Sequence, residues 1–210
     1  MGTSERKERE RELRKRSILT AAHRIFMEKG FDNTTMDDIA DAVELSKGAV
    51  YFYFKSKSEL CLSILLESLK VISASFDQIS GEAIKGIDKL KKIFDVYYDF
   101  QEENPQFLNA IINFRHHRAD CDHESEILQA TLQENDKINI ILKNCIVSGK
   151  ADGSIDNTLN EEMLANSLWG QINGLLPNMI LANKEHNEIY HTSQDLYKFS
   201  NSLIIKAIQR

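Results

Sequence analysis

The chain has 210 residues and a formal net charge of −6, with 42% hydrophobic and 28% charged residues. These values fit one large domain or a small domain followed by a larger one. Two prolines and nine glycines are few turn-forming residues for a many-stranded sheet. The charged N-terminus argues against a signal peptide, and no apolar run approaches the roughly eighteen residues of a membrane span. We therefore expect an all-α protein without a membrane partner.

Two further features of the composition concern the compartment and the charge. The cysteines, Cys61, Cys121 and Cys145, are scattered and odd in number, which favours a reducing, cytoplasmic location without a disulfide framework. Residues 1–60 carry 12 basic and 11 acidic side chains, whereas residues 61–210 carry 14 and 21. Residues 1–16 alone hold seven basic and four acidic side chains. This uneven charge fits a nucleic-acid surface, and it fits a solvated, salt-bridged helix equally well.

Helical periodicity predicts four elements in the first third of the chain. The first helix runs from the charged leader to Lys29, with an apolar face that begins at Leu13 and a stop at Gly30. A short second helix starts at Met36 after a Thr34 or Thr35 cap. A third covers residues 47–54 after a Ser46 cap. A long fourth helix then continues to about residue 79.

The second and third of these helices have the spacing of a helix-turn-helix over residues 35–54. Val50 and Phe54, four residues apart, share one face of the third helix and should be buried, so other rings of the Tyr51–Phe54 run must point outward. Lysines and tyrosine hydroxyls there can reach phosphates, and an apolar ring such as Phe52 can meet a thymine methyl. Four core aromatics of a helical bundle would give the same periodicity, so that alternative remains open at this point.

The segments ILTAAHRIFMEKGFDN (residues 18–33) and TTMDDIADAVELSKGAVYFYFKSKSEL (residues 34–60) resemble the DNA-binding domain of the TetR (tetracycline-repressor) family of bacterial regulators. The resemblance covers roughly residues 14–65. It implies about nine helices: an N-terminal three-helix DNA-binding domain at residues 1–60, then a larger helical effector-binding and dimerisation domain at residues 61–210.

Position by position, the resemblance also implies DNA contacts. Groove-facing residues would be Lys47, Gly48, Ala49, Tyr51 and Phe52, and phosphate contacts would be Thr35, Tyr53 and Lys57. One departure is Glu44, where the family usually has glycine in the turn. Since a non-glycine residue at positive φ costs on the order of 1 kcal/mol, we expect a slightly different turn shape.

The remaining helices supply only candidates. Apolar stripes near the C-terminus fit either a contact within the chain or a homodimer interface, and the resemblance favours the dimer because a palindromic operator requires two-fold symmetry. Candidate interface residues are Leu168, Gly170, Gly174, Leu175, Phe199 and Leu203. Candidates for a largely apolar effector pocket, each of which also fits plain core packing, are Phe94, Tyr97, Tyr98, Phe107, Ile111, Phe114, Trp169 and Asn173.

The segment RHHRADCDHE, residues 115–124, gathers potential metal ligands in His116, His117, Cys121 and His123. Their spacing matches no known ligand pattern, and a polar interhelix loop explains them more simply, so we expect no metal and no cofactor. No catalytic constellation occurs, which argues against an enzyme.

We hypothesise a repressor of a palindromic DNA operator that a small-molecule effector releases. The alternatives are a helical protein-interaction or membrane-surface module without DNA binding, and a metal- or redox-sensing regulator that uses residues 116–123.

Overall fold

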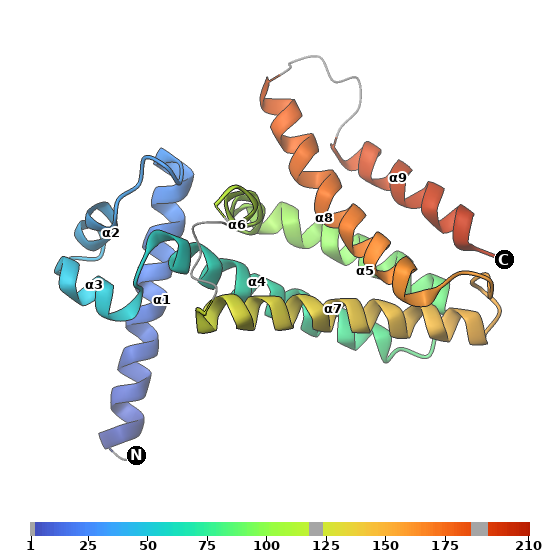
Figure 1. Ribbon diagram of the computed structural model, residues 1–210, viewed down its shortest axis with the longest axis horizontal. Coiled ribbons are helices and arrows are strands. Elements are labelled where there is room, and N and C mark those ends of the chain that lie inside the picture. Colours follow the sequence, from blue (N-terminus) through green and yellow to red (C-terminus); the bar gives the residue numbers. More distant parts are fainter. Residues whose placement is uncertain (1–2, 118–123, 186–192) are drawn as a thin grey trace. The chain divides into compact units, whose positions relative to one another are not determined.

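The structure is a computed structural model and describes residues 3–117, 124–185 and 193–210. These residues form nine helices and one isolated antiparallel bridge between Ile155 and Gln209, which confirms the expected all-α fold (Figure 1). In chain order the helices are α1 (Thr3–Lys29), α2 (Met36–Ala42), α3 (Lys47–Tyr53), α4 (Lys57–Ser80), α5 (Gly86–Glu103), α6 (Pro105–His116), α7 (Glu126–Ala151), α8 (Glu161–Glu185) and α9 (Ser193–Ile208). Among the described residues, none of these helices combines the length and hydrophobicity needed to cross a bilayer.

Contacts between residues divide the chain into two compact units. The first unit holds residues 1–68 and 106–131, and the second holds residues 69–105 and 132–210. The division differs from the expected boundary at residue 60 for two reasons. Helix α4 runs without a break through that position, and α6 returns to the first unit.

The core of the first unit is built from the C-terminal half of α1 together with α2, α3 and the start of α4. Ile18, Ile39, Val50 and Leu60, one from each helix, are fully buried. The N-terminal half of α1 lies outside this core, and residues 4–14 are all exposed. Leu13 is 57% exposed, so the expectation that the apolar face of α1 begins there is wrong, because burial starts only at Ile18.

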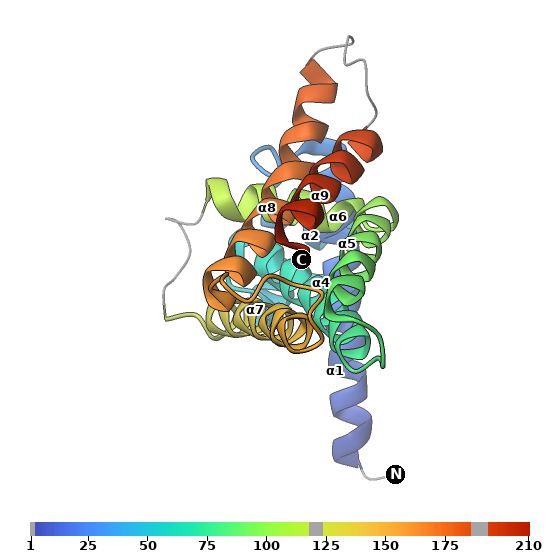
Figure 2. The same cartoon turned by 90° about the vertical axis from the view of Figure 1, so that its right-hand side faces the viewer.

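The second unit packs α5, α7, α8 and α9 with the C-terminal part of α4. Helix α9 contacts both α8 and α5 (Figure 2). The first two amides of α5 are capped from the α7–α8 connection, since Gly86 N–H donates to Asp152 Oδ2 at 2.7 Å and Ile87 N–H donates to Ser154 Oγ at 3.2 Å. A Cβ on Gly86 would lie 2.1 Å from the backbone nitrogen of Gly149, so glycine allows α5 to start directly against α7.

The turn between α2 and α3 is a Schellman motif. Leu45 N–H donates to Ala40 C=O at 3.0 Å, and Glu44 N–H donates to Asp41 C=O at 3.2 Å. Glu44 occupies the left-handed position of this motif with φ of +53° and is the one non-glycine residue with positive φ among the described residues. The turn therefore keeps the conformation that glycine prefers, with a glutamate held in it.

Glu44→Gly should stabilise the protein, because glycine adopts a positive φ without the steric cost that an L side chain incurs. We expect the free energy of unfolding to rise by roughly 1 kcal/mol, measured by denaturant unfolding followed by circular dichroism. Glu44→Ala, which retains Cβ, is the control and should give no such gain. Equal stability of the glycine and alanine variants would show that the backbone at Glu44 is not strained.

Candidate functional site

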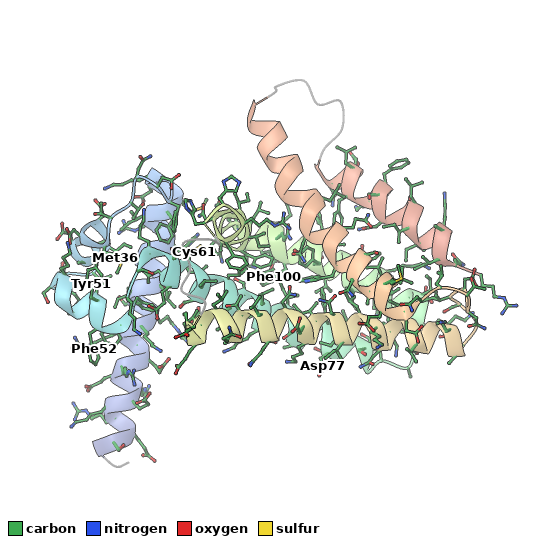
Figure 3. The ribbon with its side chains drawn as sticks, in the orientation of Figure 1. Met36, Tyr51, Phe52, Cys61, Asp77 and Phe100 are labelled. Carbon is green, nitrogen blue, oxygen red and sulfur yellow. The ribbon has the colours of Figure 1, made fainter. Side chains whose placement is uncertain are left out.

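The rotation of α3 decides which of its side chains reach solvent. Val50 and Phe54 are 0% and 3% exposed, which confirms that they form the inner face of this segment. On the outer side Phe52 is 74% exposed and Tyr51 is 41% exposed (Figure 3). Tyr53 is half-buried, and its ring meets that of Phe52 edge-on at 5.3 Å. Two large aromatic rings are thus presented to solvent on one short helix.

The N-terminal end of α3 is open and carries one lysine. Ser46 caps the helix by accepting a hydrogen bond from Ala49 N–H at 3.2 Å, as predicted. Lys47 and Gly48 are exposed, and a Cβ placed on Gly48 would meet none of the described residues within 4 Å. Another molecule can therefore approach the backbone closely at Gly48.

Lys47 is paired across the turn with a residue of α2. Its Nζ lies 2.9 Å from Asp37 Oδ2, and this hydrogen bond and charge raise the pKa of the lysine. Both side chains are more than half exposed, so solvent screens the pair and an incoming anion can compete for the ammonium group.

Thr35 forms a complete capping box at the start of α2. Its Oγ1 accepts from Asp38 N–H at 3.1 Å, and Thr35 N–H donates to Asp38 Oδ2 at 2.8 Å. Hydrogen bonds from Lys29, 2.6 Å away, and from Thr35 hold the pKa of Asp38 far below its usual range. Thr35 itself remains exposed at the surface.

Lys57, the first residue of α4, contacts the connection between α1 and α2. Its ammonium donates to the carbonyl of Phe31 at 2.6 Å and to that of Asp32 at 3.3 Å, and it lies 4.6 Å from the centre of the Phe31 ring. The sequence had indicated only a phosphate contact for this residue. The sequence did not indicate the contact with the Phe31 and Asp32 carbonyls, because about 25 residues separate them from Lys57 along the chain.

The candidate interface residues differ in exposure. Leu168 is 1% exposed and packs inside its own chain, so its expected place in a dimer interface is wrong. Phe199 and Leu203 on α9 are 62% and 51% exposed, Gly170 on α8 is exposed, and Gly174 and Leu175 are half-buried. Gln171 Nε2 donates to Ser200 Oγ at 2.6 Å, which holds the Gly170 segment of α8 beside the Phe199 segment of α9.

The candidate pocket residues fall into two groups. Phe94, Tyr97 and Trp169 are 2%, 0% and 5% exposed in the second unit, where Tyr98 and Asn173 are half-buried. Tyr97 O–H donates to Asn173 Oδ1, and Trp169 Nε1–H donates to Asn135 Oδ1 at 2.7 Å. Phe107, Ile111 and Phe114 belong to the first unit, and of these Phe107 and Ile111 are buried.

Gln101 is a polar residue in the second unit that the sequence analysis overlooked. It is 5% exposed, and neither its amide nitrogen nor its amide oxygen has a hydrogen-bond partner in the described part of the chain. An unpaired buried amide costs roughly 1–3 kcal/mol, so this group calls for a partner. The signal was available, because Leu90, Phe94, Tyr97 and Gln101 recur at helical spacing and only the last is polar.

The potential metal ligands are only partly described. His116 is exposed, whereas His117 lies with its ring 4.7 Å from that of Phe31 and its Nε2 3.2 Å from Asp32 Oδ1. Cys121 and His123 fall outside the described residues. Within the residues that are described, no three His, Cys, Asp or Glu side chains gather into a metal site.

Comparisons with known proteins find a family match in the N-terminal part of the chain. Residues 18–64 match the model of bacterial regulatory proteins of the tetR family. An HTH-type transcriptional regulator of Staphylococcus aureus is 30% identical over 90 residues, which cover 43% of this chain and 49% of that protein. The chain thus spans about half the length of the curated relatives that it matches.

The likeness to solved structures extends over almost the whole chain. A TetR-family transcriptional regulator, PfmR of Thermus thermophilus, has a TM-score of 0.70 at 21% identity and covers 90% of this chain and 97% of its own. FadR of Bacillus subtilis, solved with stearoyl-CoA, has a TM-score of 0.70 at 16% identity over 91% of this chain and 98% of its own. Residues 18–64, which contain the helix-turn-helix of α2 and α3, thus match the tetR family of bacterial regulatory proteins, and the chain shares the fold of these solved regulators.

Proposed function

We propose that the protein is a homodimeric transcriptional repressor that binds a palindromic DNA operator and leaves it when a small-molecule effector binds. The observation that carries the proposal is the outer side of α3, where Phe52 and Tyr51 are exposed beside an open helix N-terminus. Two solvent-facing rings on a capped seven-residue helix do not stabilise a monomeric helical bundle, because they add no contacts to its core. In a helix-turn-helix they lie where base edges are contacted.

The contacts divide into groove and phosphate contacts. Gly48 and Ala49 let the backbone of α3 approach the major groove, Tyr51 and Phe52 meet base edges, and Lys47 exchanges Asp37 for a DNA acceptor. Tyr53 supplies its hydroxyl for a phosphate. The Thr35 hydroxyl, which donates to Asp38 Oδ2 at 2.7 Å, exchanges this acceptor for a phosphate oxygen. Lys57 donates to two carbonyls, and an ammonium has three N–H donors, so one remains for a phosphate.

Phe52→Ala tests the groove contact. Affinity for the operator beside the protein's own gene should fall by roughly 1–3 kcal/mol, or about 5- to 150-fold, while affinity for random DNA stays unchanged. Fluorescence anisotropy at several salt concentrations measures both affinities. Ile140→Ala on α7, which removes a side chain that is 59% exposed, is the matched control and should change neither. Wild-type protein that binds no such fragment in a salt-sensitive way would contradict the proposed function.

The homodimer is supported by the exposed side of α8 and α9. Phe199 and Leu203 expose apolar surface there. Gly170 and Gly174 lie one helical turn apart, and a Cβ on either would meet none of the described residues within 4 Å. Small residues at this spacing let a second helix approach closely. Two joined DNA-binding domains then bind one palindrome together, which raises affinity by orders of magnitude.

Gly174→Leu should produce a folded, mostly monomeric protein whose operator affinity is roughly 10²- to 10⁴-fold lower. Since a Cβ at Gly174 would meet nothing within 4 Å among the described residues, we expect the leucine side chain to clash with the partner. Sedimentation reports the mass, circular dichroism the helicity, and a gel shift the binding. A variant that remains dimeric with normal affinity would move the interface elsewhere.

Effector binding is supported by polar groups within the apolar core of the second unit. Gln101 offers both a donor and an acceptor without partners in the described residues, four positions after the Tyr97 ring on α5. FadR of Bacillus subtilis, which shares the fold, was solved with stearoyl-CoA, so this architecture accommodates a molecule with a long apolar acyl chain. We infer that the amide of Gln101 binds the polar group of such an effector.

Gln101→Leu should raise the free energy of unfolding of the effector-free protein by roughly 1–3 kcal/mol, because it removes an unpaired buried amide. Denaturant unfolding measures the change. Gln78→Leu, at an exposed position of α4, is the control and should stay within about 0.5 kcal/mol. Compounds that raise the melting temperature of wild type but not of Gln101→Leu would be candidate effectors. A destabilised variant would show that the amide is already satisfied.

A further inference from the structure

The N-terminal half of α1 forms a helical arm that the DNA contacts described above do not use. The arm comprises residues 3–16 and continues past α3 (Figure 1). Its side chains from residue 4 to residue 14 are all exposed, so it adds nothing to the core of the first unit. At 1.5 Å per residue the arm is about 20 Å long, which matches about six base pairs of DNA at 3.4 Å each.

Four of the six arginines of α1 lie along one side of the helix. Successive residues at spacings of three and four form a stripe without an acidic residue, and they are Arg6, Arg9, Leu13, Arg16, Thr20 and Arg24. The four acidic residues of the arm lie outside this stripe. Arg6 and Arg24 pair with Glu10 and Glu28 at 3.1 and 4.0 Å, whereas Arg9 and Arg16 form no ion pair with the described residues.

The stripe leads to the helix-turn-helix. Arg16, Thr20 and Arg24 line a surface hollow together with Ala42 and Val43, the last residue of α2 and the residue that caps it. The arginine side of the arm is therefore continuous with the side of α1 that meets the end of α2. A helix that was merely solvated would need no such continuity between its cations and the helix-turn-helix.

We propose that this arm is a second DNA-binding element, in which the stripe from Arg6 to Arg16 binds phosphates flanking the operator half-site. The inference rests on the proposed function. Guanidinium groups bind phosphate oxygens in a bidentate manner, and neutralised phosphates release counterions, so the arm adds affinity without sequence preference. Seven basic and four acidic side chains in residues 1–16, in a chain of net charge −6, provide the charge that such a partner requires.

The test compares two double variants of the full chain with equal charge change. Arg6→Gln with Arg9→Gln alters the stripe, and Lys7→Gln with Arg11→Gln alters another side of the same exposed segment. Anisotropy titrations from 50 to 300 mM salt use an operator duplex with ten flanking base pairs at each end and the same duplex without flanks. Glutamine preserves helix propensity, which circular dichroism verifies.

On the flanked duplex the stripe variant should bind roughly tenfold or more weakly at 0.1 M salt, with a salt slope smaller by about two units, because two phosphate contacts are lost. On the trimmed duplex it should match wild type, and the Lys7/Arg11 variant should match wild type on both. If both variants lost the same affinity for the flanked duplex, the effect would come from the overall positive charge of the arm, and a specific role of the stripe would be refuted. Wild-type affinity of the stripe variant for the flanked duplex would also overturn the inference. If the arm instead bound an acidic protein or anionic vesicles, that molecule would be its partner. Wild-type protein that binds neither duplex would refute the proposed function itself.

Discussion

Burial of Val50 and Phe54, one helical turn apart, sets the rotation of α3, and the character of the surface depends on that rotation. With these two side chains inward, Phe52 and Tyr51 can only face solvent. The Schellman turn at Glu44 and the Ser46 cap then fix where α3 begins relative to α2. Core packing therefore produces an exposed aromatic surface, which is the surface proposed above to bind DNA.

The connection that precedes the helix-turn-helix is held from several sides. Phe31 packs against Phe26 with ring centres 5.3 Å apart, lies beneath the Lys57 ammonium, and meets the ring of His117. One aromatic residue thus joins the end of α1, the start of α4 and the residue that follows α6. These contacts explain why the first unit includes α6, which a three-helix domain of 60 residues would leave out.

In the second unit, aromatic packing and sparse polar groups coexist. The ring centres of Tyr97 and Trp169 lie 5.6 Å apart. The Tyr97 hydroxyl donates a hydrogen bond to Asn173, and the Trp169 indole N–H donates one to Asn135. These bonds satisfy the polar atoms and orient the rings. Gln101 departs from this pattern, because neither its amide nitrogen nor its amide oxygen has a hydrogen-bond partner among the residues that the structure describes.

The sequence alone determined the local features of the protein. Helix periods, the Thr35 and Ser46 caps, and the helix-turn-helix were all predictable, because each depends on residues within a few positions of one another. The inward face of Val50 and Phe54 followed from the same short-range geometry. The tetR resemblance, which also lies in this segment, was confirmed by the family match and the fold.

Only the tertiary structure decided what covers each face. An apolar stripe on α8 indicated that Leu168 is buried, but not whether its own chain or a second copy covers it, and its own chain does. The carbonyls that Lys57 contacts, the place of α6 in the first unit and the lack of a partner for Gln101 among the described residues likewise depend on residues distant in sequence. Sequence periodicity shows which face of a helix is apolar. What covers that face depends on packing between elements that are far apart along the chain.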